Sequence, residues 1–299
     1  MKTTTENQVF TLRNLLVLHT EYVNELRKKT PETRGTYERT LREFMRWLHS
    51  EKDFQFQEKN IERYKQYLFK KKKLTHTSVV MYLSSVRKFC DYLITRGVLR
   101  KNPARGVRGG TPSITHTRKS ISGSDLMKFL QAIDRSNEIG YRDFAMVKLM
   151  IGCGLSEIEL VRADVGDVKI QRKKMELRFQ SKGRTEKDSS VILSGEVFDA
   201  VKVYMIFRTK AKSSDPLFMS AGNRTRGDRM TSRGIRERIN FYFAQAGIKN
   251  GEARKITALS LRLTAIKMLA ASGASVEEIQ KKFRIKKTST VELYLKEPD

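Results

Sequence analysis

Cysteine, long apolar runs and acidic residues are scarce in this sequence, and each shortage excludes a class of protein. Cys90 and Cys153 are the only cysteines among 299 residues, so neither a disulfide framework nor a cysteine zinc site is expected. No window of 18 apolar residues occurs, which argues against a transmembrane helix and a membrane partner. The first ten residues, MKTTTENQVF, lack the apolar core of a signal peptide. We therefore expect a soluble cytoplasmic protein.

The charge is strongly positive and is spread along the chain. Lys and Arg number 60 against 33 Asp and Glu, which gives a net charge of +27 and a pI near 10.1. Residues 1–117 hold 24 basic and 11 acidic side chains and so carry +13, which leaves +14 for the remainder. This balance predicts a polyanionic partner, in the first place nucleic acid and in the second an anionic membrane surface. Because no tail concentrates the charge, we expect both halves to contact phosphates.

The first hundred residues show the periodicity of four amphipathic helices. The first covers about residues 11–29, and the second starts at Thr30-Pro31, a capping residue followed by proline. The third contains the apolar stripe from Ile61 to Leu68, and the fourth begins near Thr77-Ser78. Together they predict a four-helix unit.

A run of four lysines separates the third of these helices from the fourth. Hydroxyl and cationic side chains follow on or beside the fourth helix, and this combination suits contacts to phosphate. The alternative interpretation of the lysine run is a solvated loop. The predicted DNA contacts are Lys70, Lys71, Lys72, Lys73, Thr77, Arg87 and Lys88.

Residues 103–119, PARGVRGGTPSITHTRK, predict a linker because they are rich in glycine, proline and threonine and lack apolar periodicity. The chain then divides into a helical DNA-binding domain at 8–102, this linker, and a second domain at 120–299. In the second domain MELRF and SSVIL flank the turn QSKGRTEKD, which predicts a β-hairpin. Helices are expected near 123–135, 138–152, 156–163, 194–210, 231–247, 256–272, 275–283 and 288–297.

Residues 257–264 read TALSLRLT and set Arg262 among three leucines. An ordinary amphipathic helix does not alternate apolar residues strictly around a charge. Because an unpaired buried guanidinium is costly, packing alone is a poor reason for an arginine at this position. We expect Arg262 to meet Glu159 when DNA is absent and a phosphate when DNA is bound.

Four motifs of the second domain resemble, in order, those of the tyrosine recombinases, the phage-type integrase family with Xer-like members. The blocks of that family read G-L-R-x-x-E-L, H-x-L-R-H and L-G-H, with a tyrosine nine residues after the last histidine. This sequence has G-L-S-E-I-E-L at 154–160, L-S-L-R-L at 259–263, F-R-I at 283–285 and Tyr294. The resemblance implies a mainly α fold: an N-terminal four-helix core-binding (SAM-like) domain and an α-rich catalytic-type domain with a small antiparallel β-hairpin or sheet.

The resemblance also implies a chemistry. In the family, a tyrosine hydroxyl attacks a DNA phosphodiester and becomes joined to the 3′ phosphate. Two arginines hold the non-bridging oxygens, where bidentate donors suit developing negative charge. A lysine on the hairpin turn protonates the leaving 5′ oxygen, and histidines assist proton transfer. No metal or other cofactor is required.

Three of the family positions are retained in this sequence. Tyr294 stands at the nucleophile, Arg262 at the second arginine, and Lys182 in SKGR at the hairpin lysine. These three are the predicted catalytic residues. Arg262 is also predicted to contact DNA, and so is Arg184, two residues after Lys182.

Three other family positions are lost. Ser156 stands in place of the first arginine, and Leu259 and Ile285 stand in place of the two histidines. The four histidines of the chain all precede position 117, so none lies in the second domain. Ser156 also has a structural interpretation, because S-E-I-E is typical of a helix capping box closed by Glu159. Leu259 and Ile285 are expected to be core residues.

The predicted function is a tyrosine-recombinase-like protein that closes on double-stranded DNA as a two-domain clamp and is catalytically impaired. One alternative is a divergent, active recombinase or integrase of a mobile genetic element that forms a 3′-phosphotyrosine through Tyr294. It would use Arg262 and Lys182 together with substitute cations drawn from Arg184, Arg254, Lys255, Arg284 and Lys286. Another is a nucleic-acid-binding structural protein that keeps only the fold. We expect a nucleoid-associated monomer in the absence of DNA, with a second recombinase subunit as a candidate partner.

The division of charge predicts a salt-sensitive interaction with duplex DNA. Each neutralised phosphate contributes about −0.9 to the slope of log K against log salt concentration on B-DNA. Fluorescence anisotropy over a salt series is therefore expected to give a steep slope for the full chain and shallower slopes for either half. Equal slopes for the full chain and the isolated second half would contradict the clamp.

Overall fold

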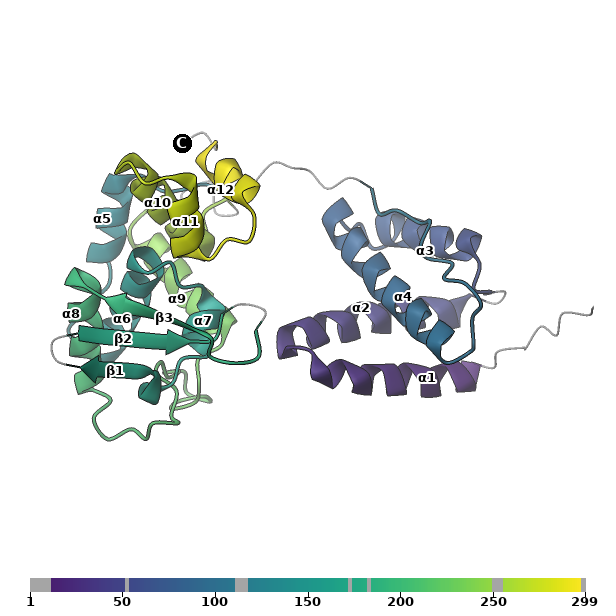
Figure 1. The fold of residues 1–299 in the computed structure, drawn as a ribbon, viewed down its shortest axis with the longest axis horizontal. Helices are drawn as coiled ribbons and strands as arrows, with labels where there is room; N and C mark the ends of the chain where they lie inside the picture. The colour runs from purple at the N-terminus through teal and green to yellow at the C-terminus, as the bar shows by residue number, and fades with distance from the viewer. Residues whose placement is uncertain are drawn as a thin grey trace, which may run out of the picture. The chain divides into compact units, whose positions relative to one another are not determined.

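The chain forms two compact units, residues 1–114 and 115–299, which are described separately (Figure 1). The computed structural model describes residues 12–51, 54–110, 118–171, 174–181, 184–248 and 255–296. Within these ranges no helix is both long and apolar enough to cross a membrane.

The first unit is a four-helix bundle, as its periodicity predicts. Its helices are α1 (Leu12–Glu25, continued by a 3₁₀ turn at Leu26–Lys28), α2 (Pro31–Ser50), α3 (Glu58–Lys70) and α4 (His76–Thr95). The side chains of Thr30 and Thr75 accept hydrogen bonds from backbone N–H groups in the first turns of α2 and α4. Such caps satisfy donors that a helix start leaves open.

The predicted linker begins later than residue 103, because residues 103–110 pack on the first unit. Ala104 and Val107 are buried in its apolar core. The Arg87 guanidinium donates from Nε to the Ala104 carbonyl and from Nη2 to the Val107 carbonyl, both at 3.1 Å. The Asn102 amide donates to the Arg87 carbonyl at 2.9 Å. Residues 103–110 therefore have the composition of a linker but are held on the first unit by side-chain hydrogen bonds.

The second unit is a helical domain with one small sheet. Its helices are α5 (Gly123–Gln131), α6 (Glu138–Gly152), α7 (Glu157–Val161), α8 (Gly195–Ile206), α9 (Ser232–Gln245), α10 (Ala258–Ala271), α11 (Val276–Phe283) and α12 (Thr288–Leu295). Each corresponds to an expected helix, and the ends differ by a few residues. The mainly α fold with a small antiparallel sheet is confirmed.

The sheet has three antiparallel strands in the order β1-β2-β3. The predicted hairpin is formed by β2 (Lys174–Phe179) and β3 (Ser189–Leu193), with Met175 opposite Leu193. Along β2, Met175, Leu177 and Phe179 are buried and face the core. The third strand, β1 (Val168–Gln171), was not predicted. This strand is only four residues long, and because a basic segment follows it, the alternation of apolar and polar residues is too short to be recognised.

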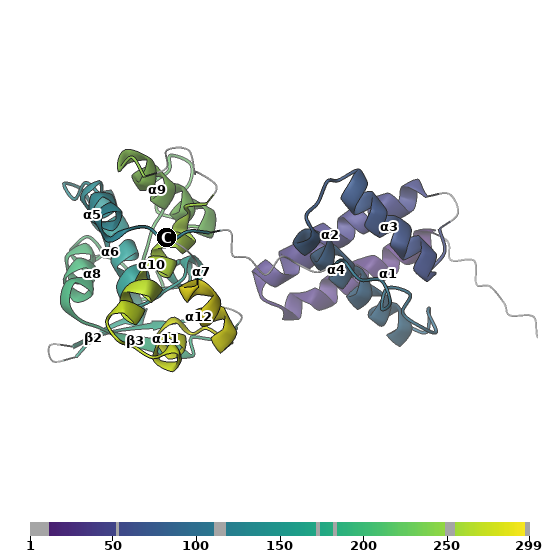
Figure 2. The same ribbon diagram turned by 90° about the horizontal axis from the view of Figure 1, so that it is seen from above.

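The three C-terminal helices gather on one side of the second unit (Figure 1 and Figure 2). α10 contacts α6, α11 and α12, and α11 contacts α12. A separate apolar cluster of Ile266, Ile279, Phe283 and Val291 joins α10, α11 and α12. This cluster fixes the turn between α11 and α12 and thereby the residues on either side of it.

The contacts of Arg87 predict that its main role is structural. Arg87→Ala removes the bonds to the Ala104 and Val107 carbonyls, and we expect a loss of about 1.5–3 kcal/mol of unfolding free energy. Trp47, the single tryptophan, is buried in this unit, so urea unfolding followed by its fluorescence reports the loss directly. The matched control is Lys88→Ala, an exposed neighbour expected to stay within about 0.5 kcal/mol. Equal stabilities of the two variants would contradict this role.

Candidate active site

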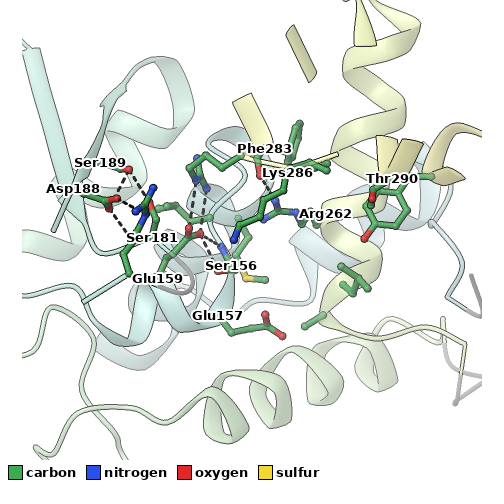
Figure 3. A pocket seen from close by; sticks show the side chains of 18 residues that line it. Ser156, Glu157, Glu159, Ser181, Asp188, Ser189, Arg262, Phe283, Lys286 and Thr290 are labelled. Atoms are coloured by element: carbon green, nitrogen blue, oxygen red, sulfur yellow. Dashed lines mark hydrogen bonds and ion pairs between the residues drawn. The ribbon is translucent and has the colours of Figure 1, made fainter. Parts of the chain in front are cut away.

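One pocket of the second unit collects nearly all of the second-domain positions singled out in the sequence. Its volume is about 560 Å³, and its walls come from the α6–α7 loop, the hairpin, α10 and the segment from α11 to α12 (Figure 3). The predicted residues that line it are Ser156, Arg184, Leu259, Arg262, Ile285 and Tyr294. Lys182, the predicted catalytic lysine, lies outside the described residues.

Helix geometry explains why these side chains meet. Leu259 and Arg262 are one turn apart on α10 and therefore share a face. Tyr294 lies one turn after Val291, which is buried in the cluster beneath α12. Leu259 and Ile285 are half-buried and line the pocket, and Ile285 also packs against the apolar cluster of the C-terminal helices, so neither is a fully buried core residue.

Within the described ranges, Arg262 is held by neutral acceptors only. Its Nη1 donates to the Gly154 carbonyl at 2.9 Å, and its Nη2 donates to the Phe283 carbonyl. The guanidinium also lies over the Phe283 ring, 5.5 Å from the ring centroid. Burial lowers the pKa of Arg262 from its usual value, while the nearby Glu159 and Tyr294 act in the opposite direction. An arginine nevertheless stays protonated in proteins, so a half-buried positive charge lines the pocket.

The expected pair between Arg262 and Glu159 is not formed. Glu159 is buried and instead pairs with Arg284, whose Nε donates to Oε1 at 3.3 Å and whose Nη2 donates to Oε2 at 3.2 Å. Figure 3 shows Glu159 at the centre of a set of dashed bonds, while Glu157 stands apart without one. No carboxylate in the described ranges forms an ion pair with Arg262.

Ser156 is the N-cap of α7 and forms the predicted capping box with Glu159. The Glu159 Oε2 atom accepts from the Ser156 backbone N–H at 2.7 Å and from its hydroxyl at 2.9 Å. The serine at the first-arginine position therefore has a structural role in this pocket.

Arg284, which the sequence offers only as a substitute cation, has a structural role in the pocket that the motifs do not predict. It ends α11 in the left-handed conformation, with φ 52° and ψ 42°, which a non-glycine residue seldom adopts. Its Nη2 donates to the Gly154 carbonyl at 2.7 Å, the same oxygen that Arg262 contacts. The available signal was F-R-I itself, since an arginine there occupies the glycine position of the family's L-G-H block.

The hairpin turn is braced at its base. The Ser181 and Ser189 hydroxyls lie 2.7 Å apart, and exposed Arg184 pairs with Asp188 at 3.3 Å. Lys187 ties this turn to Asp164 at 2.5 Å and also pairs with Asp167. Burial works against the charge of Lys187, but hydrogen bonds to the two carboxylates outweigh it and raise its pKa.

In the first unit the predicted DNA contacts fall into two groups. The exposed group contains Lys70, Lys71, Lys72, Lys73, Thr77 and Lys88. Lys72 is paired with the buried carboxylate of Glu43 at 3.0 Å. Arg87 is half-buried and holds the segment at 103–110, so its guanidinium is committed to protein carbonyls. The exposed members remain predicted contacts.

The cap at Ser156 yields a stability prediction. Ser156→Ala removes the hydroxyl from the capping box, and we expect a loss of about 0.5–2 kcal/mol of unfolding free energy. Chemical denaturation followed by circular dichroism measures this loss. Ser190→Ala, at an exposed position of β3, is the matched control and is expected to change stability by less than about 0.5 kcal/mol. An unchanged stability of Ser156→Ala would contradict the role as a cap.

Comparison with known proteins agrees with the motifs. The sequence model of the phage integrase family matches residues 119–299, and that of the phage integrase SAM-like domain matches residues 14–108. Tyrosine recombinase XerC of Vibrio cholerae serotype O1 (strain ATCC 39541) is 28% identical over 227 residues, 75% of this chain and 68% of that protein. XerC of Vibrio vulnificus (strain YJ016) is 30% identical over 220 residues, 73% of this chain and 65% of that protein.

Solved structures support the same fold. The XerH site-specific recombinase bound to palindromic difH substrate has a TM-score of 0.69 at 16% identity, covering 96% of this chain and 82% of that one. A lambda integrase (75–356) dimer bound to a core site has a TM-score of 0.67 at 14% identity, covering 95% and 97%. The phage integrase match by itself covers more than half of the sequence. The chain belongs to the phage integrase family, that of the tyrosine recombinases.

Proposed function

We propose that this protein binds duplex DNA, holds a backbone phosphate at Arg262, and has lost most or all of the strand-cleaving activity of its family. The observation that carries the proposal is the state of Arg262. Among the described residues, this half-buried, protonated guanidinium contacts two carbonyls and no carboxylate, in a pocket also lined by Tyr294. Such a guanidinium lacks a counterion, and an anionic ligand would supply one.

Electrostatics favours a phosphate at this position. Charge–charge interactions strengthen where water is excluded, so an anion gains more here than at the exposed lysines of the surface. The guanidinium fork also matches phosphate oxygens better than an ammonium group does. Two of its five N–H donors reach protein carbonyls, which leaves donors for a ligand.

Impaired cleavage is proposed from the positions at which the family's groups are missing. A serine, a leucine and an isoleucine stand at positions 156, 259 and 285, where the family has an arginine and two histidines. Removing one preorganised donor for the developing charge typically costs ~10²–10³ in rate. Three losses together are expected to cost ~10⁴ or more, even though such effects are not additive.

A second candidate function is an active recombinase that cleaves through Tyr294. The observation in its favour is that Arg284 brings another guanidinium to the pocket that Tyr294 and Arg262 line. The missing histidines weigh against it, because no histidine occurs after position 116 to supply proton transfer.

The exposed lysines of the first unit are proposed to supply backbone contacts of low sequence specificity. The lambda integrase of the solved complex is described as a dimer bound to its core site. By analogy, a second recombinase subunit is a candidate partner for this chain on DNA. Arg184 is proposed to contact the same DNA strand as the pocket, and so is Lys182, which the sequence assigns to the same turn.

Two substitutions test the proposed function. Selection from a randomised duplex pool first supplies a preferred sequence, and its absence would favour a protein that keeps only the fold. Arg262→Ala is expected to weaken binding to the selected duplex by about 10- to 150-fold, the loss of charged hydrogen bonds worth ~1.5–3 kcal/mol. Tyr294→Phe is expected to leave affinity unchanged, because it removes only a hydroxyl.

The same pool carrying a nick in each duplex tests cleavage. An active enzyme would trap a covalent adduct that survives denaturation and disappears in Tyr294→Phe, whereas we expect none from the wild-type chain. If Arg262→Ala instead lowered the melting temperature while the folded protein kept its DNA affinity, the phosphate role of Arg262 would be wrong.

A further inference from the structure

Glu159 and the two arginines near it form an unequal arrangement of charge. Both guanidinium groups donate to the Gly154 carbonyl oxygen, Arg262 at 2.9 Å and Arg284 at 2.7 Å. Of the carboxylates that the structure describes, Glu159 is the one that pairs with either of them, and it pairs with Arg284 alone. Two cations therefore converge on one neutral oxygen, and only one of them is compensated.

The hydrogen bonds of Glu159 explain why it does not reach Arg262 as well. Its two oxygens accept from the Ser156 backbone N–H, the Ser156 hydroxyl, and Nε and Nη2 of Arg284. Three of these donors share Oε2, and the Arg284 Nε reaches Oε1, so Arg284 engages both oxygens of the carboxylate. Arg262 is near enough for Glu159 to affect its pKa, yet its own donors go to the Gly154 and Phe283 carbonyls.

We infer that Arg284 is a positioning residue of the phosphate site: by occupying Glu159 it keeps the Arg262 guanidinium free of an internal ion pair and available to an anion. The inference rests on the proposed function and adds a residue to it. Without Arg284, Glu159 would be a buried carboxylate short of a cation. The nearest cation would then be Arg262, and an internal pair would compete with the phosphate.

The structure holds Arg284 in place independently of any ligand. Besides Glu159 and Gly154, Nη1 donates to the Lys282 carbonyl at 3.0 Å, and the guanidinium lies over the Phe179 ring at 4.8 Å. All three guanidinium nitrogens, Nε, Nη1 and Nη2, thus donate to oxygens of the protein. Because its nitrogens already donate to the protein, Arg284 orders the pocket rather than offering free donors to a phosphate.

The test measures how strongly DNA affinity depends on Arg262 in different backgrounds. The readout is the ratio of dissociation constants for the selected duplex with and without Arg262→Ala, measured in the full chain. In the wild-type background the ratio is expected to be about 10 to 150. In an Arg284→Gln background it is expected to fall below about 3, because Glu159 then captures Arg262.

Removing the carboxylate as well supplies the rescue. In the Glu159→Gln/Arg284→Gln background the ratio is expected to return to about 10 or more, since no carboxylate then competes for Arg262. If Arg284 had a purely structural role, Arg284→Gln would change stability and leave the ratio at its wild-type value. If Arg284 contacted the phosphate directly, adding Glu159→Gln would not restore the ratio. Either of those two results overturns the inference.

Two further variants complete the design. Lys281→Gln removes an exposed cation of α11 one turn before Arg284 and is expected to leave the ratio unchanged. If Arg284→Gln does not fold, Arg284→Lys keeps a cation for Glu159, and its ratio is expected to stay above about 10; a lower value overturns the inference. A wild-type ratio near 1 would instead refute the phosphate role of Arg262 itself.

Discussion

The buried carboxylate of Glu159 is the interaction on which the pocket depends. It joins two segments that are far apart in the sequence, the start of α7 and the residue that ends α11. A buried carboxylate must be paired and hydrogen-bonded, or it is strongly destabilising. Because Arg284 meets that requirement, the turn that leads to Ile285 and α12 is fixed against the α6–α7 loop. The place of Tyr294 on the pocket wall follows from this turn.

The same arrangement leaves a positive charge that the folded chain does not neutralise. Gly154 offers one carbonyl to two guanidinium groups, and Phe283 offers another to Arg262. Such dipoles orient Arg262 without cancelling its charge. Preorganised anion sites have this feature, because folding meets the cost of keeping the charge before the ligand arrives. The helix cap at Ser156 and the proposed anion site at Arg262 are compatible because Glu159 bonds to Ser156 and not to Arg262.

Periodicity and motif order were sufficient to predict the helices, the hairpin and several of the residues that line the pocket. They failed where tertiary contacts override local signals. Residues 103–110 have the composition of a linker, yet Arg87 holds them on the bundle. The partner of Glu159 depends on a left-handed backbone at Arg284 that spacing alone does not reveal. Motif spacing identifies the backbone positions that converge, whereas it does not decide which of two arginines reaches one carboxylate.

The net charge of +27 overstates how many cations are available to DNA, because many already have protein partners. Lys72 is paired with Glu43, Lys187 with Asp164, and Arg284 with Glu159. The exposed, solvated lysines that remain add a salt-sensitive attraction that any duplex can satisfy. Arg262 differs from them because it is half-buried, is oriented by two carbonyls, and has no carboxylate partner within the part of the chain that the structure describes. Its contribution therefore depends on where a phosphate lies relative to the pocket, which surface charge cannot specify.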